Sequence, residues 1–201
     1  MATIHPGATL TPHFRDFLPA WMARQPWFRG TSAPSLSPVG YFRFEDPAGA
    51  VGIETHLVSD GSTLYQVPLT YRGAPLGGAG GALVATAEHS VLGTRWIYDG
   101  PSDPVWVDEL LHLIQTGGVS EPSVRHGVGS AEARGHRTVS GALTRDTVGI
   151  DLKRVVIAGD PVRGPGVLGL VTGNWHPGGP DSDVATGCLA VVREIAHADH
   201  G

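Results

Sequence analysis

The histidines, carboxylates and single cysteine of this chain show no spacing that a known catalytic or metal site requires. Ten histidines are spread along 201 residues. No two of them lie four residues apart on an expected helix, and none joins a His/Cys cluster of zinc-binding spacing. Cys188 stands in the apolar run 186–191, a setting typical of a buried, unreactive thiol. We therefore expect no metal and no thiol nucleophile.

Paired carboxylates occur twice, at Asp108-Glu109 and at Asp181/Asp183. A working acid–base pair needs an environment that separates the two pKa values, and no neighbouring residue of either pair supplies one. Solvated charges are the favoured interpretation over an acid–base pair. The loop Gly77–Gly81 is rich in glycine but lacks the Lys-Ser/Thr of a phosphate-binding loop, so we read it as a flexible connection. No catalytic residue and no cofactor are predicted.

Aromatic residues offer a different chemistry, because a tryptophan face can stack on a sugar ring. The stretch WMARQPWFRG (21–30) holds two of the five tryptophans. Core packing at the end of a first helix is favoured there over a ligand platform. If the chain binds a small ligand, the candidate residues are Trp27, Arg29, Arg95, Trp96, Asp99, Trp175 and His176.

Composition limits the classes of function. The formal net charge is −5 and no run of Lys/Arg occurs, so a nucleic-acid partner is not expected. The first eleven residues lack the pattern of a secretory signal, and no apolar run approaches the ~20 residues of a membrane helix. A single cysteine permits no internal disulfide. These features predict a soluble, cytoplasmic protein.

Two helices are expected. The first starts with Thr11 as cap and Pro12 as first residue, continues with apolar residues at helical spacing, is kinked or split by Pro19, and ends before Pro26. The second is capped by Asp103, begins at Pro104 and stops at Gly117-Gly118.

Strands are expected in most of the remaining chain. Residues 51–58 and 63–71 predict a hairpin with Asp60-Gly61 in its turn, and Pro68 predicts an edge position or a bulge. Residues 118–136 look irregular. Further strands are expected at 41–44, 82–89, 92–98, 137–143, 152–157, 167–175 and 186–195. This order of elements predicts an α+β fold with an antiparallel sheet, in a single domain over residues 1–201.

Three blocks of sequence, in the same order, resemble the N-terminal cap domain of bacterial maltokinases. The blocks are Leu18–Gly30, Tyr65–Arg72 and Gly93–Gly100, the last followed by Asp103-Pro104 and a leucine-rich helix. Pro26 and Thr31 depart from the family pattern, which has Arg and Lys there. The resemblance covers most of residues 14–117, whereas residues 118–201 match loosely and are expected to complete the same sheet.

The resemblance implies a curved antiparallel sheet of about seven to nine strands with two main helices, similar to the cystatin fold. A maltokinase continues into a kinase body with a His-x-Asp catalytic loop, whereas the sole His-x-Asp of this chain is His197–Asp199, next to its last residues. Phosphoryl transfer therefore lacks its parts, and no catalytic residue is carried over.

Three functions remain open at this point. The first is a non-catalytic accessory or regulatory module for a separate kinase or a glucan- or trehalose-metabolising enzyme. The second is a small-molecule or carbohydrate-binding domain that uses exposed aromatics on the concave sheet. The third, an enzyme in its own right, is the least favoured.

Overall fold

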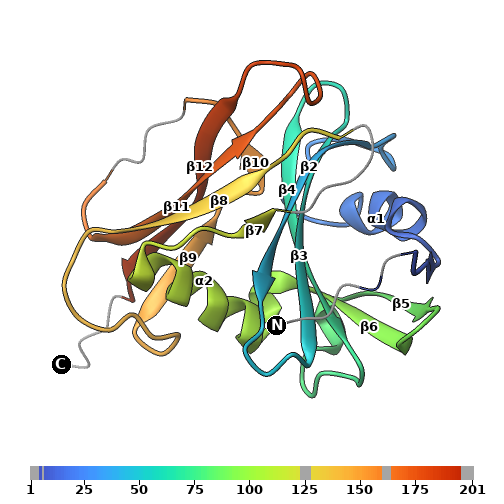
Figure 1. Cartoon of the computed structure of the whole chain (residues 1–201), viewed down its shortest axis with the longest axis horizontal. Helices are drawn as coiled ribbons and strands as arrows, with labels where there is room; N and C mark the ends of the chain where they lie inside the picture. The colour runs from blue at the N-terminus through green and yellow to red at the C-terminus, as the bar shows by residue number, and fades with distance from the viewer. Residues whose placement is uncertain (1–4, 6, 123–127, 160–163, 196–201) are drawn as a thin grey trace.

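The computed structural model describes residues 5, 7–122, 128–159 and 164–195. Two helices and two antiparallel sheets make up the described fold (Figure 1), which confirms the predicted α+β class. The helices are α1 (Phe14–Met22) and α2 (Pro104–Thr116). The strands are β1 (Leu10–Thr11), β2 (Ser37–Glu45), β3 (Val51–Ser59), β4 (Leu64–Arg72), β5 (Leu83–His89), β6 (Gly93–Asp99), β7 (Glu121–Pro122), β8 (Glu132–Arg137), β9 (Val148–Leu152), β10 (Val155–Val156), β11 (Val167–Trp175) and β12 (Ala185–Glu194). Two 3-10 turns, η1 (Gly80–Ala82) and η2 (Gly100–Ser102), precede β5 and α2.

The larger sheet, sheet A, has eight strands in the order β1-β5-β6-β4-β3-β2-β7, with β10 added beside β4. The smaller sheet, sheet B, has the order β8-β11-β12-β9. Among the described residues after position 117, only β7 and β10 join sheet A. The expectation that this region completes the same sheet is therefore corrected: its longer strands pair with one another and form sheet B.

The two faces of sheet A are covered by different elements. Helix α1 packs on one face, over side chains of β4, β5 and β6 such as Val67, Val84 and Ile97. Helix α2 and sheet B cover the other face, where Trp106, Ile114 and Leu189 join side chains of β2 and β3. Sheet A is thus the middle layer of the molecule, with a hydrophobic core on each side.

The ends of α1 differ from the prediction. His13, not Thr11, caps the helix: its Nδ1 accepts a hydrogen bond from the Arg15 amide, while the Asp16 carboxylate accepts one from the His13 amide. The helix ends at Met22, before the predicted stop at Pro26. Pro19 lies inside one continuous helix and does not split it. The helix buries four side chains against the sheet, those of Phe14, Leu18, Trp21 and Met22. The free energy gained by this burial exceeds the cost of the one backbone hydrogen bond that Pro19 cannot make.

The hairpin β3–β4 forms as predicted, and the Asp60 carboxylate accepts backbone bonds from Ser62 and Thr63 in its turn. Pro68 is not at an edge or a bulge, because β4 has β3 on one side and both β6 and β10 on the other. On that second side β6 pairs from Leu69 onward and β10 pairs only up to Tyr65. Pro68 therefore lies at a gap between two partner strands, where its missing N–H is not required.

Helix α2 matches its prediction at both ends. The Asp103 carboxylate accepts a hydrogen bond from the Val105 amide at 3.0 Å, and Gly117 adopts a left-handed conformation with φ of 63°. Strands β11 and β12 also lie where the sequence predicted them. By contrast, the strand predicted at 137–143 does not form, because only Arg137 of that range lies in a strand. That strand is β8, and all of it except Arg137 lies in the region predicted to be irregular.

Candidate functional site

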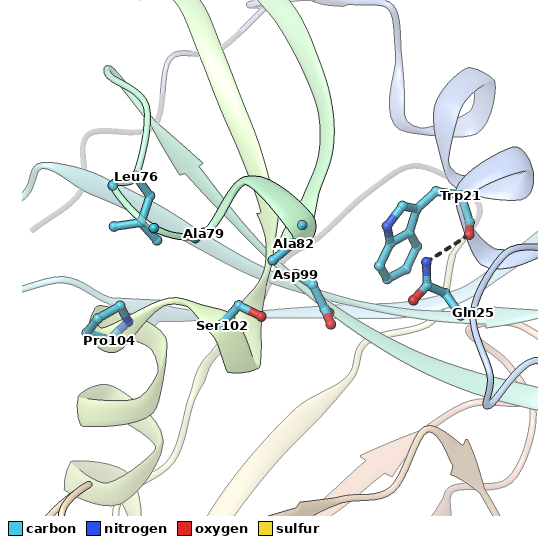
Figure 2. Close-up of a pocket in the computed structure, with 11 residues that line it drawn as sticks. Trp21, Gln25, Leu76, Ala79, Ala82, Asp99, Ser102 and Pro104 are labelled. Carbon is cyan, nitrogen blue, oxygen red and sulfur yellow. Dashed lines mark hydrogen bonds between the residues drawn. The ribbon is translucent and has the colours of Figure 1, made fainter.

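A pocket of about 610 Å³ opens on the α1 side of sheet A, where β6 ends and α2 begins. Figure 2 shows Trp21 and Gln25 on one side of it and the loop bearing Leu76, Ala79 and Ala82 on the other, with Asp99 between them. Ser102 and Pro104 line the part nearest α2. We call this site the Asp99 pocket. Its volume lies in the range of small-molecule sites.

Asp99 is held by a residue that is distant in sequence. The Arg154 guanidinium donates a hydrogen bond to the Asp99 carboxylate. The same guanidinium lies over the Trp27 ring, 4.9 Å from its centroid. The side chains of Asp99 and Arg154 are only 15% and 13% exposed. A cation between a carboxylate and an aromatic face is well compensated when it loses water, so Arg154 fixes Asp99 beside the pocket.

This ion pair keeps unused hydrogen-bonding capacity. Within the described residues, Asp99 Oδ1 and Arg154 Nη1 are buried and have no hydrogen-bond partner. Burial raises the pKa of Asp99 above its ordinary value of 3.8, although Arg154 acts in the opposite direction. Leaving a buried polar atom unpaired costs free energy. The pair is therefore a polar element that a ligand group could complete.

The glycine loop forms the outer wall of the pocket. Gly77, Gly78 and Gly81 all line it. Gly78 has a φ of 77°, which explains a glycine there, and an added Cβ at Gly77 or Gly81 would meet no atom within 4 Å. Packing does not require glycine at those two positions. Their effect is to leave the wall without side chains and its backbone groups within reach of a ligand.

The buried pair of Arg72 and Asp103 holds the start of α2 in place. Arg72 donates two hydrogen bonds of 2.6 Å, one to each carboxylate oxygen of Asp103, which is fully buried. Burial tends to raise the pKa of Asp103, but the hydrogen bonds and charge of Arg72, together with further hydrogen bonds such as that from the Val105 amide, hold this pKa below 3.8. Because Asp103 also caps α2, the pair fixes the position of Ser102 and Pro104 in the pocket.

The structure places the candidate ligand-binding residues in several locations. Asp99 lines the pocket. Trp27 contacts Arg154, which forms the ion pair with Asp99. Arg95 and Trp96 are half-buried on β6, and the Arg95 guanidinium donates to the Leu92 carbonyl. Arg29 is exposed beyond α1.

The remaining two candidates, Trp175 and His176, lie at the end of β11. Trp175 is 2% exposed within the core between the sheets, so its ring has no free face for a sugar. His176 is half-buried, with its Nδ1 2.7 Å from the Ser182 carbonyl oxygen.

The accessible tryptophans do not share a face. Trp96 pairs with Arg72, on the α2 side of sheet A, whereas Trp27 packs on Tyr65, on the α1 side. Trp106 is 1% exposed inside the core. The expectation of exposed aromatics on the concave sheet is therefore corrected: Trp21 is buried and Trp27 is half-buried, and the two rings lie together beside the Asp99 pocket.

Several pocket residues were missed from the sequence. Arg154 gave no signal, because nothing local links it to Asp99, 55 positions away. Gln25 and Ser102 were read only as parts of a helix end and a turn. The glycine loop was noted but interpreted as a connection. An exposed glycine cluster near a buried carboxylate is the feature that could have directed attention to this site.

No group of three or more His, Cys, Asp or Glu side chains is placed to hold a metal ion in the part of the chain that the structure describes. None of the helices seen there has the length and apolar character needed to cross a membrane. His197 and Asp199 lie outside the described residues. Cys188 is buried in β12.

Comparison with known proteins gives one family. Residues 21–103 match the family described as the maltokinase N-terminal cap domain. The match begins at Trp21, covers β2 to β6 and ends at Asp103, so it confirms the resemblance found in the sequence. No curated protein matches the chain. Trp27 and Asp99 fall inside the matched range and Arg154 falls outside it.

Proposed function

We propose that this protein is a non-catalytic accessory or regulatory module, related to the cap of maltokinase-type sugar kinases. Its partner would be a separate sugar kinase or an enzyme of glycogen, trehalose or maltose metabolism. The observation that carries the proposal is the match of residues 21–103 to a domain described as the cap of another enzyme. A sugar kinase requires ATP, which would place a complex with such a kinase in the cytoplasm.

The matched part is structurally suited to present a surface. Strands β2 to β6 form the centre of sheet A, between the two hydrophobic cores. The turn between β5 and β6 carries Val91 and Leu92, which are 59% and 45% exposed. These exposed apolar side chains are available for contact with a partner surface, and this turn lies within the matched range.

Affinity capture of the tagged protein from cells of its source would test the proposal. We expect one enzyme of sugar phosphorylation or of glucan or trehalose metabolism to be recovered in stoichiometric amount. The double change Val91→Ser with Leu92→Ser should reduce that recovery. The matched control is Val184→Ser, which removes an equally exposed apolar side chain, 57% exposed, outside the matched range.

A second assay separates an accessory role from catalysis. The purified protein is incubated with ATP-Mg and maltose, and ADP formation is followed. The proposal expects no turnover above the blank. Turnover by the chain alone, or a monomeric elution profile without any stoichiometric partner in the capture, would contradict an accessory role.

A further inference from the structure

We propose that the Asp99 pocket binds a neutral, hydroxyl-rich ligand of about the size of one hexose ring. This inference goes beyond the accessory role and does not depend on it, because it concerns a site completed within this chain. It follows from the size, charge and surface chemistry of the pocket.

The charge of the pocket argues against an anionic ligand. Among the described residues, Asp99 is the only ionisable side chain on the lining, and Arg154 compensates its charge from beside the pocket. A phosphate placed against the glycine loop would find no lysine or arginine on this described lining, and the positive charge of Arg154 is already engaged by Asp99. The glycine loop therefore does not act as a phosphate cradle, although its composition resembles one.

The polar groups of the pocket suit hydroxyls. Ser102 and Gln25 offer a hydroxyl and an amide, and the Gln25 Nε2 is already used in a bond to the Trp21 carbonyl, which leaves its Oε1 as an acceptor. Asp99 Oδ1 and Arg154 Nη1 lack partners within the described residues. A hydroxyl group donates and accepts, so ligand hydroxyls can pair with the Ser102 hydroxyl, the Gln25 Oε1 and the Asp99 carboxylate of the lining.

The apolar part of the lining suits the C–H face of a ring. Leu76, Ala79 and Ala82 come from the loop, Pro104 comes from α2, and the Trp21 indole lies across from the loop in Figure 2. A pyranose has hydroxyls at its edge and C–H groups on its faces. The mixture of apolar wall and polar floor matches that distribution, in a volume of about 610 Å³ that also admits a second ring.

Isothermal titration calorimetry on the purified full chain tests the site, with glucose, maltose and glucose 6-phosphate as probes. We expect glucose or maltose to bind, and glucose 6-phosphate to bind at least about tenfold more weakly because the described lining offers its phosphate no cation. Absence of binding heat with both neutral sugars would overturn the proposal. Tighter binding of glucose 6-phosphate would overturn it as well.

Variants locate the binding. Ala82→Trp fills the pocket and should abolish sugar binding, while its matched control Ala142→Trp adds the same ring at an exposed position far along the chain and should bind as wild type does. Ser102→Ala is a mild second variant for which we expect an affinity loss of roughly threefold to tenfold. Unchanged affinity in a folded Ala82→Trp protein would show that the sugar binds elsewhere. This experiment does not use partner capture. Failure of the sugar-binding proposal can therefore be told apart from failure of the accessory role.

Discussion

Asp99 and Asp103 lie four positions apart, and the fold shifts their pKa values in opposite directions. Asp99 is buried on the α1 side of sheet A with a pKa above the ordinary value, and Asp103 is buried on the α2 side with a pKa below it. Each has an arginine partner, but Arg72 makes two hydrogen bonds to Asp103 and Arg154 makes one to Asp99. At Asp103 the Arg72 charge and several hydrogen bonds to the carboxylate together outweigh burial, whereas at Asp99 burial outweighs the opposing effect of Arg154.

Asp103→Ala should destabilise the protein by about 3 kcal/mol, because it removes the cap of α2 and leaves the Arg72 guanidinium unpaired in a largely buried position. Urea unfolding followed by circular dichroism measures this. The control is Asp108→Ala, which breaks an ion pair with Arg145 whose side chains are about half exposed and should cost no more than about 0.5 kcal/mol. Equal effects of the two changes would contradict the role given to Asp103.

The pH dependence of stability tests the environment of Asp99. Its raised pKa means that the folded protein binds this proton at a pH where the unfolded chain has released it. Wild type should therefore gain stability relative to Asp99→Asn as the pH falls from neutral through the raised pKa toward 3.8. Below that value both states carry the proton and the difference should level off. Urea unfolding of both proteins across this range gives the result, and a difference that shrinks on acidification would contradict the assignment.

At the scale of elements, close contact between helix α2 and strand β8 depends on one glycine. A Cβ added at Gly135 would lie 2.1 Å from the Leu113 carbonyl oxygen of α2. That atom belongs to backbone and cannot move aside without shifting the helix. Gly135 thus sets the distance between α2 and sheet B.

Gly135→Ala should therefore destabilise the fold by roughly 2–3 kcal/mol or more, as overpacking against backbone does. Gly149→Ala is the matched control, since Gly149 lies in β9, the other edge strand of sheet B, and a Cβ there meets no atom within 4 Å. It should be neutral or slightly stabilising. Thermal unfolding of both variants gives the comparison, and a neutral Gly135→Ala would disprove the close approach.

Elements with strong local patterns could be predicted from the sequence. Helix α2 has a cap, a first-turn proline and a terminal glycine, and β11 and β12 are apolar runs bounded by turns. Strand β8, with the sequence EARGHR, has two arginines and the glycine that α2 requires, so its pattern resembles a loop. Tertiary packing, and not local preference, makes it a strand.

At the scale of the whole molecule, sheets A and B are joined by a shared core and by buried polar contacts. Gln66 on β4 is 3% exposed, and its amide donates to the Leu189 carbonyl of β12 at 2.9 Å. The core between the sheets draws on α2, sheet A and sheet B together. The candidate site also depends on the packing of the two sheets, because Arg154, which follows β9 of sheet B, pairs with Asp99 on β6 of sheet A. Such long-range pairings leave no local pattern, which is why the site was only partly predicted.

We expect residues 1–201 to unfold as a single domain. Near-ultraviolet circular dichroism, which follows the buried tryptophans, and far-ultraviolet circular dichroism should give coincident transitions in urea. Trp106 and Trp175 report on the core between the sheets, while Trp21 reports on the core under α1. Two separated transitions would mean that the two cores fold independently.

The accessory role is tested most directly by the activity of the enzyme that the tagged protein captures. Its kcat/KM is measured with and without a stoichiometric amount of this chain. We expect a reproducible change in kcat/KM on addition of the chain, and a smaller change with the Val91→Ser, Leu92→Ser variant. An enzyme whose kinetics are the same in the presence and absence of the chain would contradict an accessory role.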